Sequence, residues 1–353
     1  MTDTPLKIGI AGLGTVGVGV VKLLSQQVDL ISQRSGRDIV VTNVSARDST
    51  KDRNINLSGI NWSNNPLEMA VSPDVDVVIE LIGGHSGIAK ELVESAIING
   101  KHVVTANKAL IAHHGTELAQ LAEQANVAIA FEAAIAGGVP IVKALREGLA
   151  GNKILRVFGI LNGTCNYILS EMRQTGKDFD LILKEAQDLG YAEADPTFDV
   201  EGIDTAHKLA ILTSLAFGSE LNFNSVHIEG ISKISPLDIE FADELGYRIK
   251  LLGISRQTGS GIDQRVHPCM VPVDSPIAHI EDVFNAVVVD GDFVGTTMYE
   301  GRGAGEGPTA SSVVSDIIDI ARERKLNTFT IPAIELKKAE TVPIAEHVGS
   351  YYL

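Results

Sequence analysis

A glycine-rich turn near the start of the chain constrains the fold more than any other stretch. The apolar run Leu6–Ala11 leads into GLGTVG at residues 12–17, and apolar residues then recur with helical spacing to about Gln27. A strand, a G-x-G-x-x-G turn and a helix in this order are typical of dinucleotide-binding domains, where a pyrophosphate approaches backbone N–H groups at the helix N-terminus. The alternative is a turn that only packs the helix on the strand. The pattern favours contact with a dinucleotide by Gly12, Gly14, Thr15, Val16 and Gly17.

The segments that follow alternate between strands and helices. Apolar runs at residues 39–46, 75–82, 102–105 and 127–131 indicate strands, and residues 88–99 have helical spacing. The nearly uninterrupted run at 75–82 is typical of a strand buried on both faces of a parallel sheet. We therefore predict an α/β fold with a Rossmann-type, doubly wound parallel sheet. Ligands bind beyond the carboxyl ends of such strands, which favours a functional role for Lys108.

The residues after the second predicted strand bear on the choice of cofactor. They read Ala46-Arg47-Asp48, with Lys51 and Arg53 close behind. An acid at this place would bind the ribose 2′-hydroxyl of NAD, whereas an arginine would face the 2′-phosphate of NADP. Arg47 leads us to favour NADP, and Asp48 keeps NAD open. Each of these charges can also be an ordinary solvated loop residue.

An acidic stretch followed by a predicted helix carries the second candidate site. Residues 188–204 contain Glu193 and Asp199 but no lysine or arginine, and Lys208 comes four residues after Asp204. In a helix Asp204 and Lys208 are neighbours, and Ile211 and Leu215 continue the same face toward apolar surroundings. Such a pair can hold a lysine for proton transfer, and the acidic loop can bind the ammonium group of an amino-acid substrate. The alternative is a surface salt bridge beside a solvated loop.

The remaining segments after Pro140 predict a second, α+β domain with an open sheet. Residues 154–161 indicate a strand, and Asn162-Gly163-Thr164-Cys165-Asn166-Tyr167 forms a polar turn before an apolar helix. Residues 266–273 and 286–293 indicate strands of the open sheet. A glycine-dense loop at 300–309 precedes a predicted helix at 310–322, and it either covers a bound cofactor or serves as a linker.

Charge and cysteine content narrow the classes of function. A formal net charge of −16 at pH 7 argues against nucleic acid and anionic membranes, since both require basic surface. No stretch approaches the roughly 20 apolar residues of a membrane span. Cys165 and Cys269 are too few for a disulfide framework or a thiolate metal site. We expect a cytoplasmic, reduced protein.

Six motifs in this order resemble homoserine dehydrogenase over essentially the whole chain. They are GLGTVG at 12–17, TANKALIA at 105–112, FEAAIAGGVPI at 131–141, GILNGTCNYIL at 159–169, LGYAEADPTFDVEGIDTAHKLAIL at 189–212 and GRGAGEGPTASSVVSD at 301–316. The first is shared by many Rossmann proteins, whereas NGTCNYIL and GYAEADP…GIDTAHKL are far more specific. The resemblance implies reversible, NAD(P)-dependent interconversion of L-homoserine and L-aspartate 4-semialdehyde, the branch-point step toward threonine, isoleucine and methionine.

The resemblance also implies roles for individual residues. Lys208 is the expected acid/base, held by Asp204, and a free lysine titrates near pH ~10.4, so alkaline solution should favour oxidation. Lys108 is expected near substrate and nicotinamide, and Gly305 in a loop that touches the cofactor. The implied substrate-binding residues are Glu193 and Asp199. The family binds a sodium ion largely through main-chain carbonyls, here those of Glu132, Ile135, Gly137 and Val139.

The family's organisation gives further expectations. We predict an NAD(P)-binding domain over residues 1–138 and a catalytic and dimerisation domain over 139–306. A C-terminal helix and tail over 307–353 should return to the nucleotide-binding domain. The implied assembly is a homodimer through the sheet of the second domain. Longer relatives carry an ACT regulatory domain that begins about where this chain stops, so we expect no threonine feedback through such a domain.

Three alternatives stay open at this point. A phosphorylating semialdehyde dehydrogenase would use a cysteine nucleophile, and Cys165 is the candidate, although no histidine is near it in sequence to act as a base. A catalytically inactive NAD(P)-sensing protein would keep the fold, but it would have no need of the lysine–aspartate pair. The third is an oxidoreductase of related architecture that acts on another sugar or amino acid.

Overall fold

A computed structural model describes residues 4–324 and 327–347. The chain divides into two compact units, Met1–Lys143 with Ala304–Leu336, and Ala144–Gly303 with Lys337–Leu353. Each unit is built around one six-stranded sheet. None of the described helices combines the length of a membrane span with the apolar character that such a span needs.

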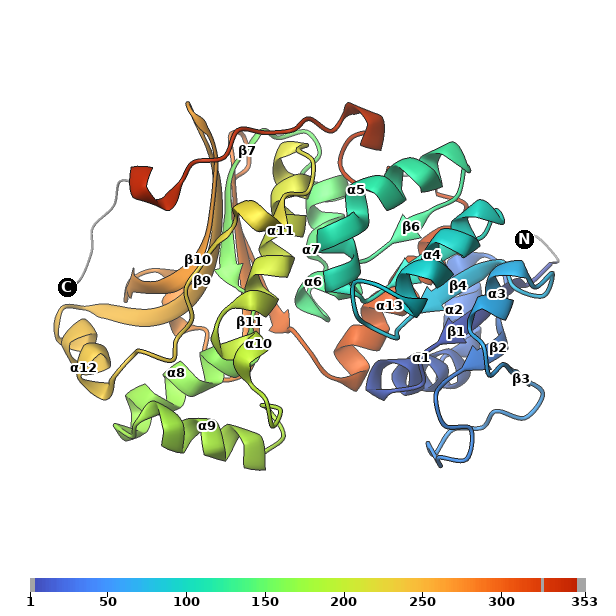
Figure 1. Cartoon of the computed structure of the whole chain (residues 1–353), viewed down its shortest axis with the longest axis horizontal. Coiled ribbons are helices and arrows are strands. Elements are labelled where there is room, and N and C mark those ends of the chain that lie inside the picture. The colour runs from blue at the N-terminus through green and yellow to red at the C-terminus, as the bar shows by residue number, and fades with distance from the viewer. Residues whose placement is uncertain (1–3, 325–326, 348–353) are drawn as a thin grey trace. The chain divides into compact units, whose positions relative to one another are not determined.

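The sheet of the first unit is parallel throughout, which confirms the predicted doubly wound fold (Figure 1). Its strand order is β3-β2-β1-β4-β5-β6, so the order reverses between β1 and β4. This is the arrangement in which a dinucleotide binds at the crevice beside β1. The strands are β1 (Leu6–Ala11), β2 (Ile39–Ser45), β3 (Asn61–Trp62), β4 (Val77–Glu80), β5 (His102–Thr105) and β6 (Ile129–Ala130).

Helices connect these strands, as the alternation in the sequence predicts. All four residues of β4 are buried, which explains why residues 75–82 are mostly apolar. The helices are α1 (Thr15–Gln26), α2 (Val28–Ser35), α3 (Leu67–Val71), α4 (Ile88–Ile98), α5 (Lys108–Gln124), α6 (Ala133–Ala136) and α7 (Ile141–Lys143), followed after the second unit by α13 (Glu306–Ala321) and the short η4 (Ala333–Glu335).

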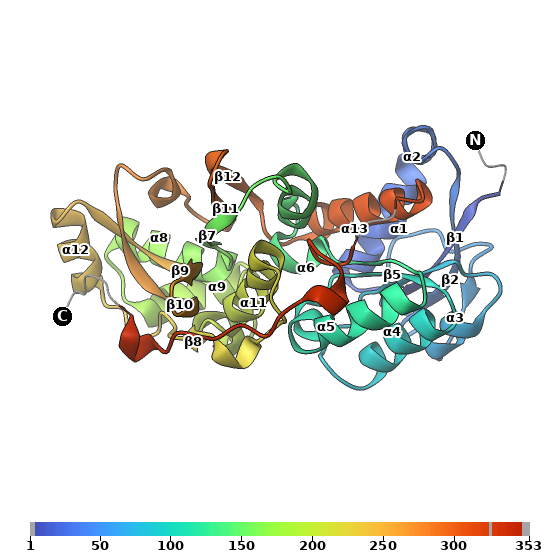
Figure 2. The same cartoon turned by 90° about the horizontal axis from the view of Figure 1, so that it is seen from above.

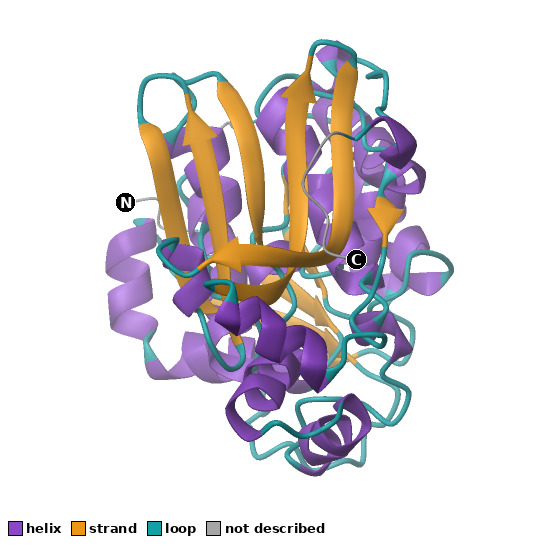
Figure 3. Ribbon diagram, turned by 90° about the vertical axis from the view of Figure 1, so that its left-hand side faces the viewer, coloured by secondary structure: helices purple, strands orange, loops and turns teal. Residues whose placement is uncertain are grey.

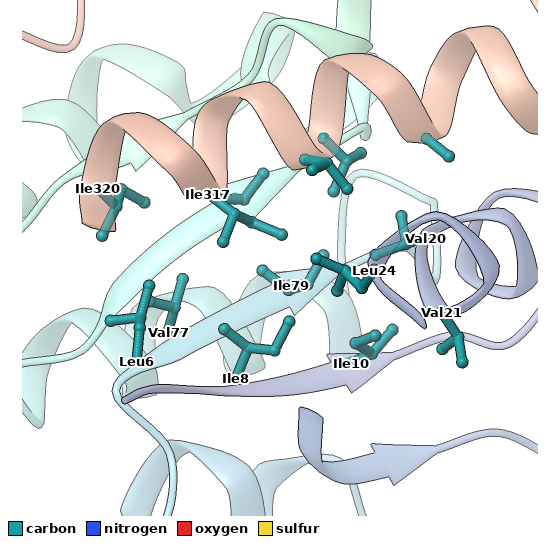
Figure 4. Close-up of a cluster of buried hydrophobic side chains, with 14 of the residues drawn as sticks. Leu6, Ile8, Ile10, Val20, Val21, Leu24, Val77, Ile79, Ile317 and Ile320 are labelled. Atoms are coloured by element: carbon teal, nitrogen blue, oxygen red, sulfur yellow. The ribbon is translucent and has the colours of Figure 1, made fainter. Parts of the chain in front are cut away.

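Helix α13 belongs to the core of the first unit although it comes late in the chain. It lies along α1 (Figure 2), and this close approach requires glycine at Gly19, where a Cβ would lie 2.8 Å from the Glu306 carbonyl oxygen. Ile317 and Ile320 of α13 point toward side chains of β1, β4 and α1 (Figure 4). Burial of this apolar face holds the helix on the sheet.

The second unit contains a mixed sheet with the strand order β12-β11-β7-β9-β10-β8. All its pairings are antiparallel except that of β8 with β10. Figure 3 shows its long strands, with helices against one face of the sheet. The strands are β7 (Ile154–Ile160), β8 (His227–Ile228), β9 (Tyr247–Thr258), β10 (Gly261–Pro272), β11 (Phe284–Gly291) and β12 (Gly295–Arg302).

One helix of the second unit, α11 (Ile203–Phe217), is buried from Asp204 to Leu215. It begins after Gly202 and ends at Gly218, both in the left-handed conformation that glycine adopts without strain. The other helices are η1 (Ala144–Gly148), α8 (Gly163–Thr175), α9 (Phe179–Asp188), α10 (Thr197–Val200), η2 (Phe223–Ser225), α12 (Pro236–Glu244), η3 (Pro276–His279) and η5 (Ile344–Glu346).

Several predicted boundaries differ from the structure. The C-terminal stretch expected to return to the nucleotide-binding domain does so only as far as Leu336, and the chain from Lys337 onward belongs to the second unit. The loop expected at 300–309 is much shorter, since β12 pairs with β11 as far as Arg302 and α13 already begins at Glu306. The strand expected at 266–273 begins earlier, at Gly261. Its first half carries Asp263, Gln264 and Arg265, which are buried although they are polar. Hydrophobic periodicity does not mark such residues as strand.

Candidate active site

The three glycines of the N-terminal motif have three different environments. Gly12 has φ +108°, and a Cβ there would lie 2.4 Å from the Leu81 carbonyl oxygen. A Cβ on Gly17 would lie 2.0 Å from the Gly12 carbonyl oxygen, so this position also excludes a side chain. At Gly14, by contrast, a Cβ would meet nothing within 4 Å. The first and third glycines therefore serve the turn itself, and the second leaves open space in front of the backbone, as a pyrophosphate site requires.

The N-terminus of α1 is suited to an anion. Its N-cap is Gly14, which makes no side-chain capping bond, and the first turn carries no acidic residue. The first N–H groups of a helix have no intrahelical partner, and the helix dipole favours negative charge at this end. Thr15 and Val16 begin this helix. The residues present thus fit a dinucleotide phosphate.

The charged side chains in the loop after β2 differ in their hydrogen bonding. Arg47 is exposed beyond the strand end. Asp48 is engaged within the loop, because its carboxylate accepts the Thr50 N–H at 2.8 Å and the Thr50 hydroxyl at 2.7 Å, and these bonds lower the pKa of Asp48. Arg53 donates to the Leu13 carbonyl at 3.1 Å and ties the loop to the glycine turn. Of the three charged side chains, Arg47 is the one that no described contact fixes to the loop.

Lys108 is the first residue of α5, directly beyond β5. Asn107 caps this helix by accepting the Leu110 N–H at 3.1 Å, and its amide donates to the Gly84 carbonyl at 2.7 Å. The Glu80 carboxylate at the end of β4 accepts two further backbone N–H groups of the same loop. These bonds fix the carboxyl ends of β4 and β5, where the half-buried Lys108 begins its helix.

Glu132 lies at the start of the turn for which a sodium ion is expected. It is 1% exposed, and its carboxylate accepts the backbone N–H groups of Val142 and Lys143 at 2.8 and 2.9 Å. Its own N–H donates to the Asp316 carboxylate at 2.9 Å. Burial, together with the charge of Asp316, raises the pKa of Glu132 to about 7.

The carbonyls of this turn are the expected ligands. The Gly137 carbonyl accepts the Ser312 hydroxyl at 2.6 Å, and the Val139 carbonyl accepts the Ile141 N–H at 2.8 Å. Each carbonyl oxygen has two lone pairs, so one hydrogen bond leaves it able to bind a cation. Among the residues that the structure describes, no group of three or more His, Cys, Asp and Glu side chains could hold a metal. Carbonyl oxygens are ligands that hard cations prefer, so the main-chain oxygens of this turn are chemically suited to an ion such as sodium.

Lys208 and Asp204 form the predicted pair on one face of α11. The Lys208 Nζ lies 2.7 Å from Asp204 Oδ2, and it also donates to the Leu161 carbonyl at 2.7 Å. Lys208 is 8% exposed and Asp204 is 2% exposed. The alternative of a surface salt bridge is therefore wrong, and the pair is held in a buried, fixed geometry.

Asn162, for which the sequence alone predicts no role, links two acidic residues of the second candidate site. Its Nδ2 donates to Asp199 Oδ1 at 2.8 Å and to Asp204 Oδ2 at 2.9 Å. Its Oδ1 accepts the Cys165 N–H at 2.8 Å and caps α8. The signal that identifies it is a polar N-cap residue between a strand and an apolar helix.

The other expected residues are less tightly placed. Glu193 is exposed, and its backbone carbonyl accepts a bond from the Gln187 amide at 3.0 Å. Asp199 is half-buried. Gly305 has φ +110° and is the N-cap of α13, so it belongs to the first unit. The second unit thus brings Asp199, Asp204 and Lys208 together, and the first unit carries the glycine turn, Arg47, Lys108 and Gly305.

Cys165 is not placed for nucleophilic catalysis. It is fully buried, and its Sγ lies 3.2 Å from the Asp199 carbonyl oxygen. Burial and the neighbouring carboxylates raise the pKa of the Cys165 thiol well above its usual value. A catalytic cysteine requires the thiolate, which this environment opposes.

Two family profiles match segments that together span most of the chain. The family profile described as "Homoserine dehydrogenase, NAD binding domain" matches residues 12–132, and the profile "Homoserine dehydrogenase" matches residues 140–318. The homoserine dehydrogenase of Neisseria gonorrhoeae is 52% identical over 355 residues, covering 99% of this chain and 81% of the relative.

Two solved structures extend this likeness to the fold. A homoserine dehydrogenase from Thiobacillus denitrificans has a TM-score of 0.92 at 48% identity, covering 96% of this chain and 80% of the other. A hyperthermophilic archaeal homoserine dehydrogenase in complex with NADPH has a TM-score of 0.77 at 26% identity, covering 92% of this chain and all of the other. The chain therefore belongs to the homoserine dehydrogenase family of NAD(P)-dependent oxidoreductases.

Proposed function

We propose that the chain interconverts L-homoserine and L-aspartate 4-semialdehyde with an NAD(P) cofactor, and that Lys208 transfers the proton. The observation that carries this proposal is the buried Lys208–Asp204 pair at 2.7 Å, with the Leu161 carbonyl as a second acceptor. Two acceptors fix the direction of the Lys208 ammonium group. A buried lysine held in this way is suited to acid–base work, since proton transfer requires a fixed donor within hydrogen-bond reach.

The proposed proton transfer follows the direction of the reaction. A nicotinamide, when bound, supplies or accepts the hydride at the carbon that bears the hydroxyl group. In oxidation neutral Lys208 accepts the hydroxyl proton of homoserine, and in reduction its ammonium form polarises the aldehyde and donates the proton. Asp204 stabilises the ammonium form and keeps Lys208 in place. Alkaline solution should therefore favour oxidation.

The acidic residues beside the pair support an amino-acid substrate. Homoserine is zwitterionic, and its ammonium end requires an anionic or carbonyl partner. The Asn162 amide donates to both Asp199 and Asp204, so a single side chain connects Asp199 to the proposed acid–base pair. We assign Asp199 and Glu193 to substrate binding, and Lys108 to the neighbourhood of substrate and nicotinamide. This reaction would feed the synthesis of threonine, isoleucine and methionine.

NADP is the proposed preference between the two cofactors. Asp48, the acid that would bind the 2′-hydroxyl of NAD, already holds Thr50. Arg53 is bound to backbone carbonyls, and we favour Arg47, just beyond the end of β2, as the residue that binds a 2′-phosphate. The archaeal relative was solved with NADPH, which is consistent with this assignment. Gly14 would let the cofactor approach the backbone, Gly12 and Gly17 would shape the turn that holds it, and Gly305 would lie in the loop that touches it.

A sodium ion, a homodimer and a cytoplasmic location complete the proposal. The sodium would rest on the carbonyls of Glu132, Ile135, Gly137 and Val139. The dimer would form through the second sheet, where Met298, Val288, Phe158 and Ile254 are successive partners across four strands and Met298 is 38% exposed. Cys165 and Cys269 are free thiols, as a reducing compartment maintains them.

A substrate panel tests the reaction. Purified protein is incubated with NADP at alkaline pH and L-homoserine, and reduced nicotinamide is followed by its absorbance. We expect reduction with L-homoserine and none with L-threonine or L-serine at the same concentration. Aspartate semialdehyde with phosphate and NADP is the parallel reaction for the phosphorylating alternative. Phosphate-dependent activity there, with none on homoserine, would refute the proposal.

A further inference from the structure

The side chain of Asn162 makes two kinds of contact that a substitution can separate. Its Oδ1 caps α8 through the Cys165 N–H at 2.8 Å, while its Nδ2 bridges the carboxylates of Asp199 and Asp204 at 2.8 and 2.9 Å. The side chain is fixed by all three bonds, and the residue is 6% exposed. The cap is a structural contact. The bridge acts on the charged groups of the proposed site.

The bridge links the half-buried carboxylate of Asp199 to the buried carboxylate of Asp204. Like charges disfavour each other's ionisation, and burial adds to this effect. A hydrogen-bond donor to a carboxylate has the opposite effect, because it stabilises the ionised form. One amide donating to both carboxylates therefore supports the state in which both are ionised.

The same amide also acts on Lys208. Asp204 Oδ2 accepts both the Lys208 ammonium and the Asn162 amide. An N–H dipole directed at this oxygen offsets part of its negative charge, so the oxygen holds the lysine proton less strongly. Removal of the amide should make neutral Lys208 harder to form. Removal of the amide should therefore shift the deprotonation of Lys208 to higher pH, whereas a purely structural role predicts no particular direction of shift.

Thr164 Oγ1 also lies 3.5 Å from Asp199 Oδ2, a longer contact than either bond of the Asn162 amide. Asp199 of α10 and Glu201 beside it add negative charge, as their common effect on Cys165 indicates. The thiol of Cys165 faces the cluster from α8, and its raised pKa keeps it neutral. On the neighbouring sheet, Gly253 of β9 lies against Thr205 and Val266 of β10 lies against Gly202, and neither carries a charge.

We propose that Asn162 is a positioning residue for the acid–base pair: its amide offsets part of the negative charge on the carboxylates of Asp199 and Asp204, and thereby lowers the proton affinity of Lys208. This rests on the proposed role of Lys208 in proton transfer. The amide thereby makes neutral Lys208, the form that oxidises homoserine, available at a lower pH than the two carboxylates alone would allow.

Two substitutions separate the cap from the bridge. Asn162→Ser keeps a good helix N-cap but has no amide to reach both carboxylates. Asn162→Asp also caps the helix, but it adds a third carboxylate where the donor was. We expect the limb of the kcat–pH profile along which homoserine oxidation rises with pH to move up by about one pH unit in the serine variant, the size expected for a hydrogen bond to a charged group. In the aspartate variant it should move further.

The pH profile distinguishes this role from a structural one. Below the limb, the serine variant should lose about tenfold in kcat, and higher pH should restore the rate. A limb at the wild-type pH, with a loss that no pH restores, would overturn the proposal. If the serine variant does not fold, Asn162→Thr keeps the cap and gives the same test. Wild-type protein that does not oxidise homoserine at all would instead refute the proposed function.

Discussion

Replacement of Gly14 by alanine should weaken dinucleotide binding without harming the fold. Gly14 has φ −80° and ψ −160°, a conformation that alanine adopts freely, and its Cβ would meet nothing within 4 Å. The added methyl group would occupy the space that a pyrophosphate requires. Gly17→Ala is the matched control, because there the Cβ would lie 2.0 Å from the Gly12 carbonyl oxygen.

The magnitudes follow from these contacts. In Gly14→Ala the loss of a better N-cap and the gain from a stiffer unfolded chain nearly cancel, so stability should change by less than about 1 kcal/mol. A methyl group that displaces a phosphate oxygen from an N–H donor removes a charge-assisted bond, about 1.5–3 kcal/mol, or roughly 10- to 100-fold in Kd. Gly17→Ala overpacks backbone that cannot move aside and should cost about 3 kcal/mol.

Two assays separate the variants. Titration with NADPH, followed by nicotinamide fluorescence, measures Kd, and thermal unfolding without cofactor measures stability. Gly14→Ala should bind at least tenfold more weakly with a Tm within about 3 °C of wild type, whereas Gly17→Ala should lose roughly 6–12 °C. Wild-type affinity in Gly14→Ala would refute the assignment of this turn to the cofactor phosphate.

Three further substitutions test the charged and reactive groups. The pKa of Glu132 is raised from 4.5 to about 7 in the folded chain, so the folded state holds the proton more tightly, and stability should fall by up to about 3 kcal/mol as pH rises from about 4.5 to about 7. Glu132→Gln should abolish this fall in urea unfolding at pH 5 and pH 8, and an unchanged fall would contradict the assignment. Cys165→Ala should keep homoserine oxidation within about threefold while costing about 1 kcal/mol, and near-total loss of activity in a folded protein would restore the cysteine mechanism. Arg47→Ala should weaken NADP about tenfold or more and leave NAD nearly unchanged, and equal losses would make Arg47 a bystander.

Local patterns predict the first unit well because its elements bury their own apolar residues. Residues 75–82 contain a strand, β4, in which every residue is buried. Likewise, the spacing of Asp204 and Lys208 on a helix is sufficient to predict their contact. In both cases the information lies within one element, where periodicity and the helical repeat decide which side chains meet.

Contacts between residues that are far apart in the sequence cannot be predicted from such local patterns. Glu132 has its raised pKa partly because Asp316, 184 positions later, lies against its backbone. Asn162 bridges two carboxylates that come 37 and 42 residues later. The first half of β10 is polar, and it is a strand because it pairs with β9, where Asp263 also forms ion pairs with Arg256 and Arg265. Each of these depends on the three-dimensional fold rather than on a local pattern.

The most direct test of the proposed mechanism is the rate of homoserine oxidation in Lys208→Met. Lys184→Met is the control, since Lys184 forms a pair of the same spacing with Asp188 that is more than half exposed. We expect Lys208→Met to lose about 10²–10⁴-fold in kcat while NADP binding stays close to wild type, and Lys184→Met to keep full activity. Because Lys208→Met leaves the buried Asp204 without its partner, its Tm should fall, and the rates are compared at a temperature at which both variants are folded. A folded Lys208→Met protein that retains a rate within about tenfold of wild type would contradict the assignment of Lys208 as the group that transfers the proton.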